Sequence, residues 1–361
     1  MSLWIAFMLL PSVFSGRISC TENKLLSYRC GAHFLNNHEH YTSFGGQKAK
    51  INEFPWSVLL IYHFEDKDLR CSGVQVSPRH ILTAAHCMFK ITNTSDFCST
   101  NSRSNGIYQE LDKEGWSVYV GSKCRRTELC ENAYRVSNII VHEHFDYCEQ
   151  VHDLALMELA SNVPYSNGTA ICMPDKSSLL SKTIKAGGMG LNHARASDVW
   201  STRRALMKPA IEMRRLCLPQ VVTYRKIFEI KETNHLETVS INTSICKGDS
   251  GGPLFQLNKR GRYVVIGIAS SAWPLCRTPS HKRWNRFIDV RPYIDWICKF
   301  TGVCPTRVNK GCKKTREYNM VDNEQPGIRK HSHNITNDSF PLFMINVVVF
   351  YSVLNSILHA P

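Results

Sequence analysis

Three short motifs, far apart in the chain, constrain this protein more than any other feature of its sequence. They are TAAHC at residues 83–87, DLAL at 153–156 and GDSGGP at 248–253. A serine hydroxyl is a poor nucleophile near neutral pH, so it needs an imidazole to accept its proton, and the imidazole needs a carboxylate to fix its tautomer. The motifs therefore predict acyl-transfer chemistry by His86, Asp153 and Ser250, with no metal or other cofactor.

The order of the motifs, histidine then aspartate then serine, is the chymotrypsin order rather than that of subtilisin or the α/β-hydrolases. With the residues that flank them, the chain resembles the trypsin/chymotrypsin family of serine endopeptidases from about residue 43 to about residue 298. The segment PRHIL at 78–82 and a cysteine shortly before Asp153 resemble a trypsin-like group expanded in nematodes. The resemblance implies protein or peptide substrates, with protease inhibitors as further partners.

Short apolar runs separated by turn residues predict an all-β protein. The runs rich in β-branched and aromatic residues are 54–60, 116–120, 137–141, 154–159 and 263–268. Such spacing indicates an antiparallel barrel or sandwich. The resemblance implies two six-stranded antiparallel barrels, with His86 and Asp153 on the first and Ser250 on the second. Residues 292–300 (PYIDWICKF) predict one helix near the end of this region.

The resemblance also implies roles for residues near the serine. The backbone N–H groups of Gly248 and Ser250 would stabilise the oxyanion, and a glycine lets its amide face the hole without a Cβ clash. Ser270 matches the family serine that supports the aspartate and the substrate backbone.

The segment at which family members are activated has an unusual amino-acid sequence in this chain. Family members expose a new N-terminus, usually Ile-Val-Gly-Gly after Arg or Lys, which pairs with the aspartate beside the nucleophile, here Asp249. This chain has YTSFGG at residues 41–46, and no basic residue precedes Ser43. Either a different protease cuts between Thr42 and Ser43, another residue meets Asp249, or the protein stays latent.

The specificity pocket also departs from the trypsin pattern. Ser244 stands six residues before the nucleophile, where trypsin-like members carry an aspartate. A neutral pocket floor removes the attraction for Lys or Arg. The wall positions, usually glycine, match Ala272 and Asn285, and either side chain would shorten the pocket. We expect small to medium apolar side chains to be preferred.

These departures keep other function classes open. The main alternative is a catalytically silent trypsin-like fold that serves as an extracellular binding module. The net charge of +14 makes binding of nucleic acid or another polyanion a further candidate function,. Because the basic residues are scattered and no aromatic-interleaved basic motif is present, we predict no nucleic-acid partner.

Cysteine usage places the protein in the secretory pathway. Fifteen cysteines without a CxxC pair indicate disulfides rather than metal sites,. Five Asn-x-Ser/Thr sequons predict glycosylation, at Asn93, Asn167, Asn242, Asn334 and Asn337,. The resemblance implies three disulfides: Cys71–Cys87, Cys246–Cys276 and Cys30–Cys172. Since fifteen is odd, one thiol is free, lost with a cleaved segment or paired between chains.

The predicted organisation has five parts: a signal peptide at 1–15, a propeptide at 16–42, the peptidase domain at 43–299, a basic polar stalk at 300–339 and an apolar tail at 340–361,. Cys304 and Cys312 would staple the stalk. The tail is long enough to cross a bilayer and has no basic flank behind it. It could be a removable signal for a GPI anchor, a transmembrane segment or a buried extra helix.

Overall fold

The computed structural model describes residues 16–32, 42–43, 46–48, 53–64, 68–91, 98, 108–121, 133–190, 220–225, 227–241, 244–274 and 282–305. The predicted signal peptide and tail, and all sequons except the one at Asn167, lie outside these residues. Among the helices within them, none is long and apolar enough to cross a membrane.

A six-stranded antiparallel sheet forms the first barrel and supplies the histidine and the aspartate. Its order is β8 (Trp116–Val120), β3 (Ser57–His63), β4 (Asp68–Gln75), β5 (His80–Thr83), β10 (Ala155–Leu159) and β9 (Val136–Val141). Val118 on β8 and Tyr134, just before β9, exchange two backbone hydrogen bonds of 3.2 and 2.8 Å. These bonds connect the two edges of the sheet and close it. A separate hairpin, β6 (Phe89–Ile91) and β7 (Tyr108–Glu110), follows the histidine.

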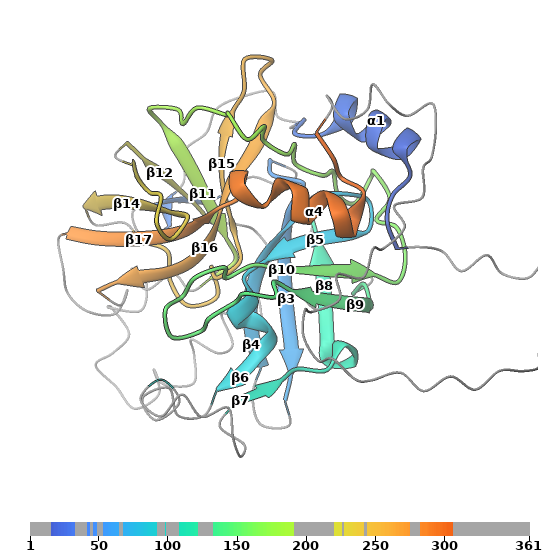
Figure 1. Cartoon of the computed structure of the whole chain (residues 1–361), viewed down its shortest axis with the longest axis horizontal. Helices are drawn as coiled ribbons and strands as arrows, with labels where there is room; N and C mark the ends of the chain where they lie inside the picture. Colours follow the sequence, from blue (N-terminus) through green and yellow to red (C-terminus); the bar gives the residue numbers. More distant parts are fainter. Residues whose placement is uncertain are drawn as a thin grey trace, which may run out of the picture. The chain divides into compact units, whose positions relative to one another are not determined.

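The second sheet carries the serine and has nine strands in the order β1-β2-β12-β11-β15-β16-β17-β14-β13. Its central six are β12 (Gln220–Tyr224), β11 (Ile184–Gly188), β15 (Pro253–Leu257), β16 (Tyr263–Trp273), β17 (Lys282–Asp289) and β14 (His235–Ile241). The edge strands are β1 (Thr42–Ser43), β2 (Gly46–Lys48) and β13 (Ile227–Ile230). The prediction of two antiparallel barrel-like sheets is confirmed (Figure 1).

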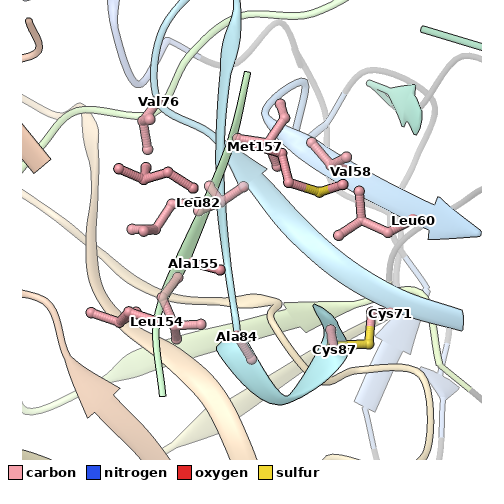
Figure 2. Close-up of a cluster of buried hydrophobic side chains, with 14 of the residues drawn as sticks. Val58, Leu60, Cys71, Val76, Leu82, Ala84, Cys87, Leu154, Ala155 and Met157 are labelled. Carbon is pink, nitrogen blue, oxygen red and sulfur yellow. A yellow bond between two sulfur atoms is a disulfide. The ribbon is translucent and has the colours of Figure 1, made fainter. Parts of the chain in front are cut away.

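Buried aliphatic side chains hold the first barrel together beneath the site. Val58 and Leu60 on β3 face Leu82 on β5 and Met157 on β10, and none of the four is more than 1% exposed (Figure 2). Full burial of one such side chain stabilises the fold by about 1.5–3 kcal/mol. Ala84, also fully buried, continues this layer from the end of β5 toward the histidine.

The predicted helix at 292–300 is present as a 3-10 turn, η6 (Arg291–Tyr293), followed by α4 (Ile294–Thr301). The buried Ile294 and Ile297 fix its inner face, and Gly302 ends it with a left-handed φ of 77°,. Two other 3-10 turns are η1 (Ala85–Met88) and η2 (Lys113–Gly115).

The segment predicted as a propeptide contains a helix that the sequence analysis missed, α1 (Cys20–Arg29). Its signal was available as a capping box, in which the Ser19 hydroxyl accepts the Glu22 N–H and the Glu22 carboxylate accepts the Ser19 N–H,.

Several contacts attach this segment to the rest of the fold. The Ile18 N–H donates to the Thr301 carbonyl at 2.8 Å, beside α4. The Asn23 amide donates to the Cys304 carbonyl at 3.0 Å. Of the two cysteines expected to staple the stalk, Cys304 is bonded to Cys298 on α4, and Cys312 lies outside the described residues. Residues 16–32 are therefore packed against α4 and the residues that follow it.

Candidate active site

The first barrel brings His86 and Asp153 together through the pairing of two strands. Ala155 at the start of β10 lies opposite Thr83 at the end of β5, so the chains just beyond these ends meet. The Asp153 carboxylate accepts the His86 Nδ1–H at 2.7 Å and the His86 backbone N–H at 2.8 Å. The first bond fixes the tautomer that leaves Nε2 free to act as a base.

A third donor completes the surroundings of this carboxylate. The Ser270 hydroxyl on β16, from the second sheet, donates to Asp153 Oδ2 at 2.5 Å. Asp153 is only 1% exposed. A carboxylate buried this deeply persists as an anion only when donors and a cation compensate for lost hydration.

The electrostatics of the pair follow from this geometry. Burial alone would lower the pKa of His86, but the charge of Asp153 and its hydrogen bond outweigh that effect and raise the pKa. Burial alone would raise the pKa of Asp153, but the charge of His86 and the hydrogen bonds from His86 and Ser270 lower it overall. The pair therefore favours an imidazolium beside a carboxylate, the charge state that forms when His86 accepts a proton.

Ser250 lies on a tight turn that the first barrel holds in place. The Ser72 N–H on β4 donates to the Ser250 carbonyl at 2.7 Å. The next residue, Gly251, has φ +82°, and a Cβ there would collide with Thr83 and with the Ser72 carbonyl. Only glycine allows the turn to approach the first barrel this closely.

The serine and the histidine meet at one disulfide. The Cys87 sulfur lies 3.9 Å from His86 Nε2 and 3.9 Å from the Ser250 carbonyl oxygen. Among the described residues, the Ser250 hydroxyl makes no direct hydrogen bond to His86. Catalytic hydrogen bonds are commonly long before substrate binds. Cys87 is bonded to Cys71, so these two sulfurs cannot serve as thiolate ligands for a metal beside His86.

The backbone at Gly248, one of the two residues predicted to form the oxyanion site, has a positive φ. Its φ is +97°, which favours glycine,. The Ser72 hydroxyl donates to the Gly248 carbonyl at 2.7 Å and accepts the Met189 N–H at 2.8 Å, which holds the peptide between Gly248 and Asp249. Across the described residues, neither the Gly248 nor the Ser250 N–H donates a hydrogen bond, so both are available to a ligand.

Asp249 points away from the triad into a cradle of glycines. Its carboxylate accepts the Gly190 N–H at 2.7 Å and the Cys246 N–H at 2.8 Å. A Cβ at Gly188 or Gly190 would collide with it. Burial raises the pKa of Asp249 to about 6, against the opposing effect of the hydrogen bonds from Cys246 and Gly190. No cation faces this carboxylate within the described part of the chain.

The predicted pocket residues also lie together. The Ser244 hydroxyl and the Ile245 N–H both donate to Asn285 Oδ1, at 2.8 and 2.9 Å. Ala272 on β16 is the cross-strand neighbour of Asn285 on β17. Asn285 is fully buried, and its Nδ2 has no hydrogen-bond partner among the residues that the structure describes. Because the Ile245 N–H can only donate, the end of the Asn285 amide that it contacts is the oxygen. The end without a partner among the described residues is therefore the N–H2 group,.

The remaining predicted positions have mixed placements. Disulfides join Cys71 to Cys87 and Cys30 to Cys172, and two further pairs are Cys98–Cys148 and Cys298–Cys304. Cys246 is disulfide-bonded, while its expected partner Cys276 lies outside the described residues. Asn167 is partly exposed, and its amide donates to the Tyr134 hydroxyl at 3.2 Å.

Sequence reasoning missed two residues that shape the site. Ser72 connects the oxyanion turn to the first barrel, and no local pattern marks it. His152 directly precedes Asp153, and its position next to the catalytic carboxylate was the available signal.

Comparisons with known proteins agree with this geometry. Residues 43–297 match the family described as Trypsin. Chymotrypsin-C from Bos taurus is 30% identical over 279 residues, which cover 74% of this chain and 92% of that protein. Serine protease ea from Drosophila melanogaster is 29% identical over 297 residues, or 77% of this chain and 71% of that protein. The CLIP domain-containing serine protease B4 from Anopheles gambiae is 26% identical over 70% of this chain and 68% of that protein. With an all-β fold of two barrel-like sheets and a match across most of its length, this chain belongs to the trypsin family of serine proteases.

Proposed function

We propose that the protein is an extracellular serine endopeptidase that acts through Ser250, His86 and Asp153. The observation that carries the proposal is the buried Asp153 carboxylate, which accepts three hydrogen bonds, two from His86 and one from Ser270. A site that had lost its chemistry would have no need to keep a buried anion so fully compensated.

In this mechanism Ser250 Oγ forms a bond to the scissile carbonyl carbon while its proton passes to His86 Nε2. The Gly248 and Ser250 N–H groups stabilise the oxyanion, a contribution of about 3–4 kcal/mol to the barrier. The intermediate then breaks its C–N bond, and His86 delivers the proton to the leaving amine. A water molecule repeats the two steps on the acyl-enzyme and releases the acid product and Ser250.

The test is labelling of the processed protein with a fluorophosphonate, followed by peptide mapping of the adduct. We expect the adduct on Ser250, and Ser250→Ala should remain unlabelled while it is secreted and folded normally. Absence of label on the processed wild-type protein would favour the alternative, a silent binding module.

The primary specificity of the proposed enzyme follows from the pocket residues. Ser244 brings no negative charge, and Asn285 occupies volume where a glycine would leave space. We infer a preference for small to medium apolar side chains over Lys and Arg. A peptide-library profile tests this, and strong selectivity for Arg would contradict it.

Activation is the least conventional part of the proposal. The half-buried Asp249 lacks a cation among the described residues, so a new α-ammonium would lower the free energy of its charged form,. We infer that a protease without trypsin-like specificity cuts between Thr42 and Ser43. N-terminal sequencing of the active protein tests this, and an uncut active chain would contradict it.

Location outside the cell is supported by four disulfides among the described residues,. We further propose removal of residues 1–15, a stalk at 300–339 and membrane attachment through 340–361. Cells that express the full chain should display the peptidase on their surface, and truncation after residue 339 should release it. Cleavage by phosphatidylinositol-specific phospholipase C distinguishes a lipid anchor from a spanning helix.

A further inference from the structure

The residue before the catalytic aspartate, His152, has a backbone conformation that most side chains avoid. Its φ is +53°, and Gln150 two residues earlier has φ +54°. Histidine is among the few residue types found in this left-handed region, whereas a β-branched residue there is strained. The Leu154 N–H donates to the His152 carbonyl at 2.7 Å. This bond closes a three-residue turn with Asp153 at its centre.

The His152 ring is held on both sides. Its Nδ1 lies 2.8 Å from the Tyr293 hydroxyl of η6. Its ring lies parallel to that of His142, with 4.9 Å between centroids and 5° between planes. The His142 N–H also donates to the Leu154 carbonyl at 3.0 Å. His142 therefore contacts the turn through both its ring and its backbone.

The second sheet braces the same turn from another direction. His235 on β14 is only 2% exposed, and its Nε2 lies 2.9 Å from the Gln150 carbonyl oxygen. Its Nδ1 lies 2.7 Å from the Thr233 hydroxyl. When this hydroxyl donates to Nδ1, the ring proton is on Nε2, which then donates to the Gln150 carbonyl. The left-handed backbone on the approach to Asp153 is thus fixed by both barrels and by the C-terminal turn.

Building on the proposed function, we propose that His152 is a positioning residue: its left-handed backbone, held by Tyr293 and His142, aims the Asp153 carboxylate at His86. From its present direction the Asp153 carboxylate accepts both the Nδ1–H and the backbone N–H of His86. A shift of about 1 Å in a catalytic group can cost roughly a hundredfold in rate.

The charges around His152 give this role a distinctive signature. The titratable groups that face it are His142, Glu143 and His144 from the loop after β9, Tyr293 from η6, and Asp153 beside it. The His144 ring lies 5.8 Å from the His142 ring and 5.9 Å from the His152 ring. Burial, together with the charge of His144, lowers the pKa of His152, and Glu143 opposes this shift. Acid that protonates two of these three imidazoles places like charges in contact and should push the turn apart.

The experiment compares three substitutions at one position: His152→Val, His152→Asn and His152→Gly. Valine resists a positive φ, asparagine tolerates it and can still bond to Tyr293, and glycine adopts it freely. We expect His152→Val to lower kcat by about 10- to 100-fold with little change in KM, and His152→Asn to stay within about threefold of wild type. His152→Gly should fall between them, because it adopts the positive φ but loses both ring contacts. His63→Val, an exposed histidine on β3, is the matched control and should leave kcat unchanged.

Two further readouts separate positioning from loss of folding. In wild type, kcat/KM should fall with acid more steeply than one proton allows, and His152→Asn should bring the slope closer to one. NMR titration should show the pKa of His86 falling toward its ordinary value in His152→Val, because the Asp153 carboxylate is no longer aligned. This measurement needs no turnover, so it tests the positioning role even where the proposed peptidase activity fails.

Wild-type kcat and an unchanged pKa of His86 in His152→Val would overturn the proposal. Equal loss in the valine, asparagine and glycine variants would also overturn it, because the loss would then come from the ring alone and not from the backbone it holds.

Discussion

The two ends of the candidate site differ in how well their buried polar groups are compensated. At the triad, the Asp153 carboxylate accepts three hydrogen bonds and faces an imidazole. At the pocket and activation end, Asn285 keeps an unpaired buried Nδ2, and Asp249 has only backbone donors among the described residues. An unpaired buried polar group costs about 1–3 kcal/mol. The Asp153 carboxylate is fully compensated in the folded chain, whereas the Asp249 carboxylate would gain most from a new ammonium,.

The largest expected effect comes from removing the negative charge at the triad, the end whose buried groups are compensated. Asp153→Asn keeps the shape of the side chain but cannot hold His86 in the required tautomer, so kcat should fall by about 10³- to 10⁴-fold. Without the negative charge, the pKa of His86 should also fall, because the attraction that raises it is lost. Measured kcat and an NMR titration of His86 check both effects. Asp295→Asn, an exposed aspartate on α4, is the control and should change neither.

The next largest effect comes from a substitution in the pocket, at the end where buried polar groups are not compensated. Asn285→Gly removes the wall side chain that is bonded to Ser244 and so widens the pocket. The preferred residue should shift toward larger apolar side chains by about 10- to 100-fold in relative kcat/KM,. The triad geometry is untouched, so cleavage of the new substrates should remain rapid. Asn138→Gly, at an exposed position of β9, serves as the control. An unchanged peptide-library profile would show that Asn285 does not limit the pocket.

A smaller effect tests the bond that joins the second sheet to the triad. Ser270→Ala removes one of the three donors to Asp153, which should raise the pKa of that carboxylate and lower kcat by roughly 10-fold,. Two His86 contacts remain, so the loss should stay well below that of Asp153→Asn. The neighbouring Ser271→Ala controls for a change on the same strand. A loss as large as that of Asp153→Asn would mean that Ser270 does more than compensate the charge.

The smallest effect concerns stability. The folded pKa of Asp249 is about 6, above the ordinary 3.8. The folded state therefore holds its proton more tightly than the unfolded state, and stability is highest below about pH 4 and decreases as pH rises through 6. Full conversion of this shift gives about 3 kcal/mol, and partial solvent contact reduces the expected loss to about 1–2 kcal/mol.

Urea unfolding of the uncleaved protein between pH 4 and pH 7 measures this loss. Asp249→Asn should abolish it, raise stability at pH 7 and prevent activation by cleavage. If Asp249→Asn instead destabilises the protein at pH 7, a cation already compensates Asp249 before cleavage.

Sequence reasoning succeeded where chemistry and local pattern coincide. The order of the three motifs identified the family, and the short apolar runs identified strands. For one of them, β8 (Trp116–Val120), the predicted bounds are the observed ones. It missed α1, although the Ser19–Glu22 capping box was present, because a segment outside the family pattern was interpreted only as a propeptide. It placed Cys304 in the stalk because a disulfide partner cannot be read from one sequence,.

The sequence by itself determined which groups are available: a base, a carboxylate, a nucleophile, flexible glycines beside it and a neutral residue at the pocket floor. Only the tertiary structure decided how they are compensated. Ser72 reaches Gly248 across 176 residues, and Ser270 reaches Asp153 across 117 residues. The left-handed turn at His152 depends on Tyr293, 141 residues away. Local patterns encode which atoms can react, but the free energy of a buried charge depends on neighbours that the fold brings from distant parts of the chain.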